Sequence, residues 1–99
     1  ADSYTELAAA DLLWKQAAWE YDHGNSDGGL ANAAKLRAAE AGFTACDRAL
    51  QTLGGFGYAR EFHVERYWRE ARLMRLAPIS QEMALNYIAQ HVLDLPKSY

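Results

Sequence analysis

Apolar residues recur at intervals of three and four in four stretches of this chain, which is the spacing of one face of an α-helix. The first stretch runs from about residue 4 to 21 and the second from about residue 30 to 53. The third runs from about residue 64 to 76, and the fourth lies between Ser80 and Pro96. The positions expected to face inward are, helix by helix, Leu7, Ala10, Trp14, Ala17 and Tyr21; Leu36, Ala39, Phe43, Cys46, Leu50 and Leu53; Val64, Tyr67, Trp68, Ala71 and Met74; and Leu85, Ile88, Val92 and Leu95.

Turn-forming residues separate the four stretches. Gly, Asn, Ser and Asp crowd residues 23–29, which we expect to be the longest loop. Gly54 and Gly55 are expected to stop the second helix in a left-handed conformation, because glycine carries no Cβ. Pro78 restricts the residue before it, so the third helix is expected to end near Ala77.

Polar residues that could cap helices support the same division. Ser3 followed by Glu6 has the form of a capping box at the start of the first helix. Ser80 can cap the fourth helix. We therefore predict an all-α fold, an up-down four-helix bundle that forms one domain over residues 1–99.

Small residues line one side of the second helix. They lie at helical spacing beside its apolar face, at Ala34, Ala38, Ala41, Ala45 and Ala49. Such a surface lets another helix approach toward the short end of the usual range of about 8–10 Å between axes. The stripe therefore predicts close contact with a partner helix.

Composition and charge exclude several classes of protein. The 99 residues are 51% hydrophobic and 23% charged, and the formal net charge is −3, so binding to nucleic acid or to an anionic membrane is not expected. No stretch has the roughly 18 uninterrupted apolar residues of a membrane span. The single cysteine, Cys46, lies on the apolar face and suits a buried inert thiol in a reducing compartment. The three scattered histidines suggest no metal site.

Charged residues are densest in the third helix and just before it. Glu65 with Arg69, and Arg66 with Glu70, are spaced to form ion pairs worth about 0.2–0.5 kcal/mol each on a solvated face. Alternatively, Arg66, Arg69 and Arg72 reach carboxylates of another helix or subunit. The sequence leaves both interpretations open.

The stretch from Gln51 to Tyr58, with the sequence QTLGGFGY, is the most unusual in the chain. Its glycines follow a helix, whereas anions prefer helix N-termini, so a glycine helix cap is one interpretation. The other is contact with a group outside the bundle. Gln51 supplies an amide that both donates and accepts hydrogen bonds, and it stands beside backbone that permits close approach.

The stretch from Gln51 to Tyr58 resembles part of the C-terminal helical domain of acyl-CoA dehydrogenases. The same resemblance extends to Glu61 and to three further runs, from Val64 to Tyr67, from Arg69 to Arg72 and from Ala33 to Arg37. The resemblance implies that residues 1–99 are one end of a larger FAD enzyme that desaturates an acyl-CoA thioester between its α and β carbons. In that family a carboxylate base takes the α proton while the β hydride passes to the flavin. The resemblance makes Gln51, Thr52, Leu53, Gly54 and Gly55 flavin contacts, in that family to the ADP part of an FAD held mainly by a neighbouring subunit.

The resemblance also implies partners. An acyl-CoA substrate, an acceptor of the electron-transfer flavoprotein type, and a homo-oligomer, either dimer or tetramer, are expected. The expected compartment is the cytoplasm, or the mitochondrial matrix in a eukaryote. An acyl-CoA oxidase, which returns electrons to oxygen, fits the same residues. A free-standing helical module that mediates self-association without catalysis is the alternative from another class.

The next family motif, Tyr-Glu-Gly-Thr-Ser-Gln/Glu, falls on the residues from Ala77 to Glu82 and departs from the family pattern. Pro78 stands where many members carry the catalytic glutamate, so the base is expected outside this chain. Ile79 takes the substrate-contacting glycine position. Ser80, Gln81 and Glu82 remain candidate flavin contacts, although Ser80 alone also suits a helix cap. One helical turn would displace Glu82 from Pro78 by about 6 Å along the helix axis, so Glu82 is not expected to replace the base.

Overall fold

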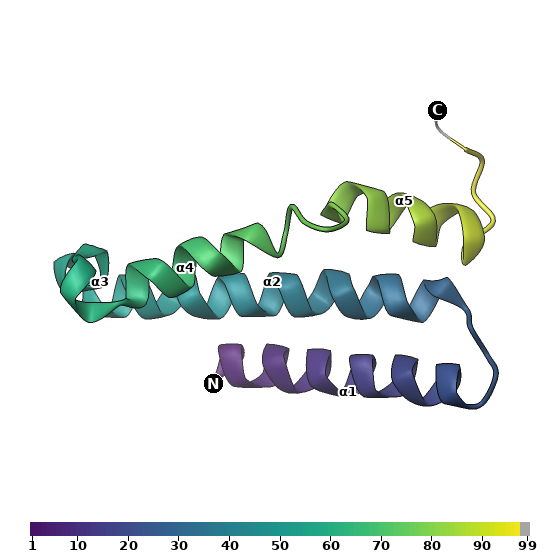
Figure 1. Cartoon of the computed structure of the whole chain (residues 1–99), viewed down its shortest axis with the longest axis horizontal. Coiled ribbons are helices and arrows are strands. Elements are labelled where there is room, and N and C mark those ends of the chain that lie inside the picture. The colour runs from purple at the N-terminus through teal and green to yellow at the C-terminus, as the bar shows by residue number, and fades with distance from the viewer. Residues whose placement is uncertain (98–99) are drawn as a thin grey trace.

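The computed structural model describes residues 1–97, and within that range the chain consists of helices and connecting turns (Figure 1). This confirms the all-α prediction. The elements are α1 (Asp2–Asp22), α2 (Gly28–Leu53), α3 (Gly55–Tyr58), the 3₁₀ helix η1 (Arg60–Phe62), α4 (Val64–Leu73) and α5 (Gln81–His91).

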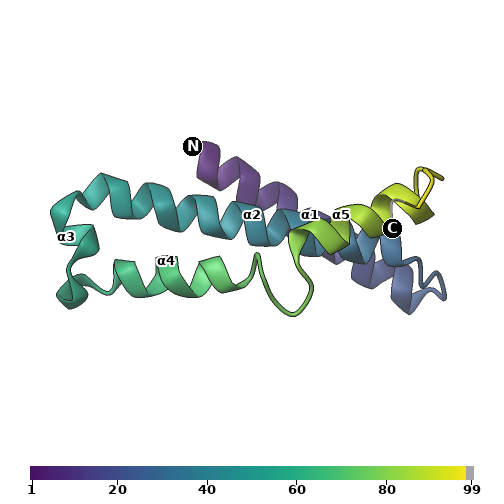
Figure 2. The ribbon, with the colours of Figure 1, turned by 90° about the horizontal axis from the view of Figure 1, so that it is seen from above.

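Helix α2 is the centre of the fold. Helix α1 runs antiparallel to it on one side, α4 lies beside its C-terminal half, and α5 packs near its N-terminal end (Figures 1 and 2). Among the described residues, α1 contacts neither α4 nor α5. The alternating direction expected from the sequence holds for α1, α2 and α4, whereas α5 continues in the direction of α4. The helices therefore pack around α2, in a body of 46 × 32 × 21 Å.

The interior is built almost entirely of alanine. The buried apolar residues are Ala10, Ala34, Leu36, Ala39, Ala41 and Ala84. Ala84 on α5 is completely buried, and Leu36 on α2 is the one long side chain in this set, with 7% of its surface exposed. Ala34 and Ala41 of the alanine stripe are covered as expected, whereas Ala38 and Ala49 are exposed. Small side chains thus let helices approach α2 from two sides.

Helix α1 is rotated from the orientation that the sequence predicts. Ala10 is buried and Leu13 and Ala17 are half-buried, but Leu7, Trp14 and Tyr21 of the expected face are exposed. Arg48 on α2 explains part of the rotation. Its guanidinium donates to the Ser3 hydroxyl at 3.0 Å and to the Glu6 carboxylate at 3.1 Å, which draws this edge of α1 toward α2.

The same contacts show that the predicted capping box is wrong. Helix α1 starts at Asp2 with Ala1 as its N-cap and has no side-chain cap hydrogen bond. Ser3 and Glu6 are instead used in the bridge to Arg48. A charged donor on a neighbouring helix has replaced the local backbone donors that a capping box would satisfy.

The inward faces of α4 and α5 also differ in part from the prediction. On α4, Trp68 is half-buried and its indole N–H donates to Asp47 at 2.8 Å, whereas Tyr67 and Met74 are exposed. On α5, Ala84 is buried and Ile88 half-buried. The remaining residues expected to face inward there are exposed: Leu85, Val92 and Leu95.

Two helices are shorter than predicted. Helix α4 ends at Leu73, and hydrogen-bonded turns continue to Ala77, whose N–H donates to the Leu73 carbonyl at 2.9 Å. Helix α5 ends at His91, and Asp94 takes a positive φ of 52° before Pro96 is reached. A residue with positive φ cannot continue a right-handed helix, so the chain leaves the helix before the proline.

Candidate functional site

The turn after α2 carries the first group of predicted flavin contacts. Gly54 has φ 57° and ψ −133°, so its φ is positive as expected but its conformation is not the left-handed helical one. Few side chains tolerate this combination, because a Cβ would clash with the backbone. The chain turns sharply at Gly54 and begins α3, a short helix between the second and third helices that the sequence predicts.

All five predicted residues of this turn, Gln51 to Gly55, are exposed. Beyond the adjoining backbone, a Cβ placed on Gly54 or Gly55 would meet no atom within 4 Å, so the space beside both glycines is open. The Thr52 hydroxyl donates to the Arg48 carbonyl at 2.7 Å and keeps its lone pairs for a further contact. The turn is therefore an accessible edge that offers an amide and bare backbone.

Gly57 holds this edge against the end of α2. It is buried, and a Cβ at this position would collide with the carbonyl oxygen of Leu50 and would lie 3.0 Å from the Leu50 Cα. The missing side chain allows the α3 backbone to lie directly on the α2 backbone. The geometry of Gly54 and Gly55 thus depends on Gly57.

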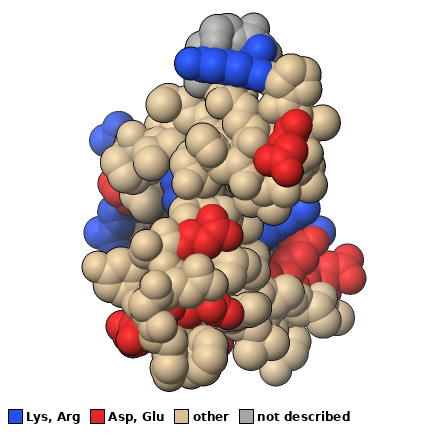
Figure 3. Space-filling view, turned by 90° about the vertical axis from the view of Figure 1, so that its right-hand side faces the viewer, with Lys and Arg blue, Asp and Glu red and all other residues tan. Residues whose placement is uncertain are grey.

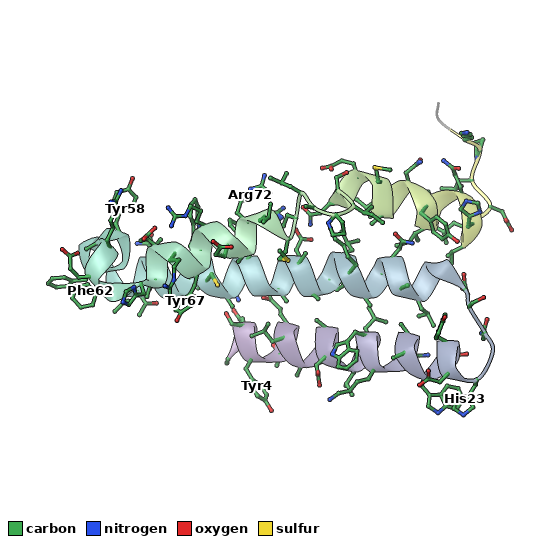
Figure 4. The ribbon with its side chains drawn as sticks, viewed as in Figure 1. Tyr4, His23, Tyr58, Phe62, Tyr67 and Arg72 are labelled. Atoms are coloured by element: carbon green, nitrogen blue, oxygen red, sulfur yellow. The ribbon has the colours of Figure 1, made fainter. Side chains whose placement is uncertain are left out.

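Aromatic side chains surround the same end of the molecule. Phe56 and Phe62 have ring centroids 5.2 Å apart, and both are exposed. Tyr58 is exposed at the same end, where Figure 4 shows it together with Phe62. Leu53, also exposed, belongs to the same end. We call Leu53, Phe56, Tyr58 and Phe62 the aromatic tip. Exposed apolar groups gathered in this way are typical of a surface that contacts another molecule.

The second group of predicted contacts lies in the loop between α4 and α5. The Lys35 ammonium on α2 donates to the carbonyl of Ile79 in this loop. Pro78 and Ile79 are exposed. Beneath Pro78, a mostly apolar groove of about 280 Å³ lies between α2 and α4 and is lined in part by Lys35, Gly42 and Phe43.

A polar network fastens the start of α5. Glu40 on α2 accepts from Arg75 at 3.1 Å and from the Gln81 amide at 3.2 Å. Arg75 Nε also donates to the Gln81 side-chain oxygen at 2.7 Å. Gln81, a predicted flavin contact, therefore uses one N–H and one lone pair of its amide inside the chain and keeps one of each for another partner.

Ser80 caps α5 as predicted, because its hydroxyl accepts from the Met83 N–H at 3.3 Å. The neighbouring Glu82 is exposed. Its own backbone N–H, followed by the Ser80 hydroxyl and the Arg72 and Arg75 guanidiniums, holds the pKa of the Glu82 carboxyl below its usual value. A general base suited to neutral pH needs a raised carboxyl pKa, so Glu82 is poorly suited to replace the missing base.

Replacing Ser80 by alanine should destabilise α5 by about 1 kcal/mol, the usual contribution of an N-cap hydroxyl. The pKa of Glu82 should rise toward its ordinary value, because one of the groups that lowers it is lost. A lowered pKa stabilises the folded state at neutral pH, and this contribution disappears as the pH falls through the Glu82 titration. NMR titration of the Glu82 carboxyl checks this, and an unchanged pKa would contradict it.

The two groups of predicted contacts do not meet within one chain. The turn at Gln51–Gly55 lies at the end of α2, whereas Ile79 and Ser80 lie beyond the other end of α4 (Figure 1). Helix α4, with ten residues, spans about 15 Å between them. The structure therefore separates two sites along α2.

The first interpretation of the charged run around α4, a set of ion pairs within the helix, holds for one of its two pairs. Glu65 and Arg69 form the predicted pair at 3.5 Å, on a solvated face. The Arg66 guanidinium instead lies 5.3 Å from the centre of the Tyr67 ring. Arg75, which lies just after the C-terminal end of α4, forms an ion pair with Glu40 on α2. The arginine that makes this ion pair to another helix is therefore outside α4 itself.

Sequence reasoning missed Glu40, Arg48 and Arg75 as structural residues. Their signal is weak, because each lies on or beside a helix where charge normally indicates a solvated face.

Cys46 is half-buried rather than buried. Within residues 1–97, no group of three His, Cys, Asp or Glu residues is placed to hold a metal ion, and no helix is long and apolar enough to cross a bilayer. At the end of the molecule seen in Figure 3, acidic and basic groups are interspersed.

The fold and the site define an all-helical domain with an open glycine turn at one end and a tethered loop along its centre. A sequence model of a known family, described as the C-terminal domain of acyl-CoA dehydrogenase, matches residues 1–93. The chain belongs to the acyl-CoA dehydrogenase family.

Named relatives agree with this membership. Acyl-CoA dehydrogenase FadE12 of Mycobacterium tuberculosis is 46% identical over 101 residues, which cover 100% of this chain and 26% of the relative. Cyclohexane-1-carbonyl-CoA dehydrogenase of Geobacter metallireducens is 36% identical over 93 residues, covering 94% of this chain and 24% of the relative. (2S)-Methylsuccinyl-CoA dehydrogenase of Cereibacter sphaeroides is 36% identical over 89 residues, covering 90% of this chain and 16% of the relative. The chain spans about a quarter or less of the length of these relatives.

Proposed function

We propose that this chain is the C-terminal domain of an FAD-dependent acyl-CoA dehydrogenase that desaturates an acyl-CoA thioester between its α and β carbons. The observation that carries the proposal is the open turn from Gln51 to Gly55 in a chain of this family. The domain contributes flavin contacts and an oligomer interface, and it is not active alone.

The residues of the turn fit the polar part of an FAD. Gln51 offers both a donor and an acceptor, and the bare backbone at Gly54 and Gly55 leaves room for a ribose or a pyrophosphate to approach. The turn is an edge rather than an enclosed pocket, so a second protein surface must complete the site. FAD, when bound, supplies the acceptor for the β hydride.

The residues of this chain near the reaction serve in binding, and none of them supplies the catalytic base. Pro78 stands at the expected base position and has no group that can take a proton, so the base comes from outside residues 1–99. Ser80 and Glu82 are exposed or half-exposed at the start of α5, where they are available to a flavin. Ile79 is the candidate for contact with the substrate.

A second copy of the protein is the expected partner at the aromatic tip. Phe56, Tyr58 and Phe62 are exposed directly beside Gly54 and Gly55, so a surface that completes the flavin site would also cover them. This supports a homo-oligomer, either dimer or tetramer. An acceptor of the electron-transfer flavoprotein type and a cytoplasmic or mitochondrial-matrix location complete the proposal.

One observation favours the alternative of a self-association module without catalysis. Large apolar side chains are exposed along the outer side of α1, including Tyr4, Leu12 and Trp19, and they could serve association alone. Figure 4 shows Tyr4 extending from α1 on the side away from α2. A full-length protein without flavin that still associates would favour this alternative.

Replacing Gln51 by alanine in the full-length protein should weaken FAD binding about tenfold, which corresponds to the loss of one net hydrogen bond. Fluorescence titration of the flavin-free protein with FAD measures the change. Gln16→Ala, at an exposed position on α1, is the matched control and should leave the dissociation constant unchanged. Equal FAD affinity in all three proteins would contradict the assignment.

A further inference from the structure

We propose that Lys35 and Glu40 on α2 are positioning residues that fix the loop from Pro78 to Gln81, and hence the substrate-facing side of the dehydrogenase. The inference rests on the proposed function, because that function gives the loop its place at the reacting groups. Neither residue needs to touch substrate or flavin. They act through Ile79, Gln81 and Arg75.

Apolar packing alone does not hold this loop. Pro78 and Ile79 are both exposed, and Leu76 just before them is exposed as well. The groove of about 280 Å³ beneath Pro78 shows that side chains do not fill the space under the loop. Other interactions must therefore restrict the loop to one conformation.

The polar contacts attach the loop to α2 at two places. The Lys35 ammonium donates to the Ile79 carbonyl, which fixes the backbone at the substrate-facing residue. Glu40 receives hydrogen bonds from Arg75 before the loop and from Gln81 at its end, so one carboxylate joins both sides of the loop. The Gln81 N–H also donates to the Arg75 carbonyl at 3.3 Å, which closes the loop on itself.

The partial burial of this network makes it more than a surface ion pair. The side chains of Arg75 and Glu40 are 28% and 41% exposed, the Arg75 guanidinium lies 5.0 Å from the centre of the Phe43 ring, and Gln81 is half-buried. Charge-assisted hydrogen bonds are stronger than neutral ones, and partial burial strengthens them further. Helix α2 thus serves as the rigid element on which the loop is aligned, and misalignment by about 1 Å can cost a hundredfold in rate.

The test compares variants of the full-length protein by hydrogen exchange and by steady-state kinetics. Lys35→Met keeps the length of the side chain but removes the donor. It should speed exchange of the backbone amides in residues 79–84 about tenfold. The matched control is Lys15→Met, because Lys15 pairs with Asp11 on exposed α1 and touches no part of the loop.

Glu40 provides a rescue comparison. Glu40→Ala should speed the same exchange about tenfold and lower kcat for an acyl-CoA about tenfold or more, with a smaller change in KM. Glu40→Gln keeps an oxygen that can accept from Arg75 and Gln81, so it should recover most of both properties.

Unchanged exchange at residues 79–84 in Lys35→Met and Glu40→Ala would overturn the proposal. It would also be overturned if Glu40→Gln were as defective as Glu40→Ala, or if kcat did not respond to the faster exchange. The proposed function fails separately, through absence of FAD and of acyl-CoA turnover in the unmodified protein, which the exchange measurement does not require.

Discussion

Replacing Leu36 by alanine should destabilise the domain by about 2–5 kcal/mol, the largest effect we expect from a single change. Leu36 is the one long apolar side chain among the buried residues, in an interior otherwise made of alanine. Alanines cannot move into the space that a leucine leaves, so a cavity remains and its cost adds to the lost burial. Thermal unfolding of the full-length protein, followed by circular dichroism, measures the change.

Leu12→Ala is the matched control for this prediction. Leu12 lies on α1 with 68% of its surface exposed, so its removal should cost much less than removal of Leu36. Two equal losses would show that the outer side of α1 is buried in the full-length protein. A Leu36→Ala variant as stable as the parent would contradict the prediction.

Replacing Gly57 by alanine should destabilise the domain by about 1–3 kcal/mol, because the added methyl group would overlap the backbone of α2. The colliding group is the Leu50 carbonyl, which cannot rotate away as a flexible side chain could. The α3 turn must therefore separate from α2, and Gly54 and Gly55 move with it. We expect lower thermal stability together with weaker FAD binding in the full-length protein.

Gly42→Ala separates this effect from the general consequence of replacing a glycine. Gly42 lies inside α2, and a Cβ there would meet no atom within 4 Å. Alanine is a better helix former than glycine, so this variant should gain about 0.5–1 kcal/mol. If Gly57→Ala were also neutral or stabilising, the close approach of α3 to α2 would be wrong.

The positions of the helices could be predicted from the sequence, but their inward faces only in part. Glycines at residues 54 and 55 and Pro78 limit the helices through local backbone chemistry, which the sequence shows directly. Helix α1 carries apolar residues on more than one side, so periodicity cannot tell which line faces α2 and which faces another surface. The structure turns Leu7 and Trp14 outward and Ala10 inward.

In the candidate site, too, features set by local sequence could be predicted, and contacts between distant residues could not. Exposure of the turn at Gln51–Gly55 agrees with the glycines that form it. The contacts of Lys35 with Ile79 and of Glu40 with Gln81 join residues far apart in the sequence, and no local pattern announces such partners. Family resemblance identified both segments, and the structure adds what holds the second one in place.

The central place of α2 has a consequence for how the chain folds. Helix α1 joins α2 through a short turn, and α4 reaches α2 through α3 and η1, so most of the first contacts are local in sequence and favour rapid folding. Because α1 contacts neither α4 nor α5 in the described part of the chain, its docking and theirs share only the α2 scaffold. We therefore expect that one side can open while the other stays closed, as two cooperative units built on one helix.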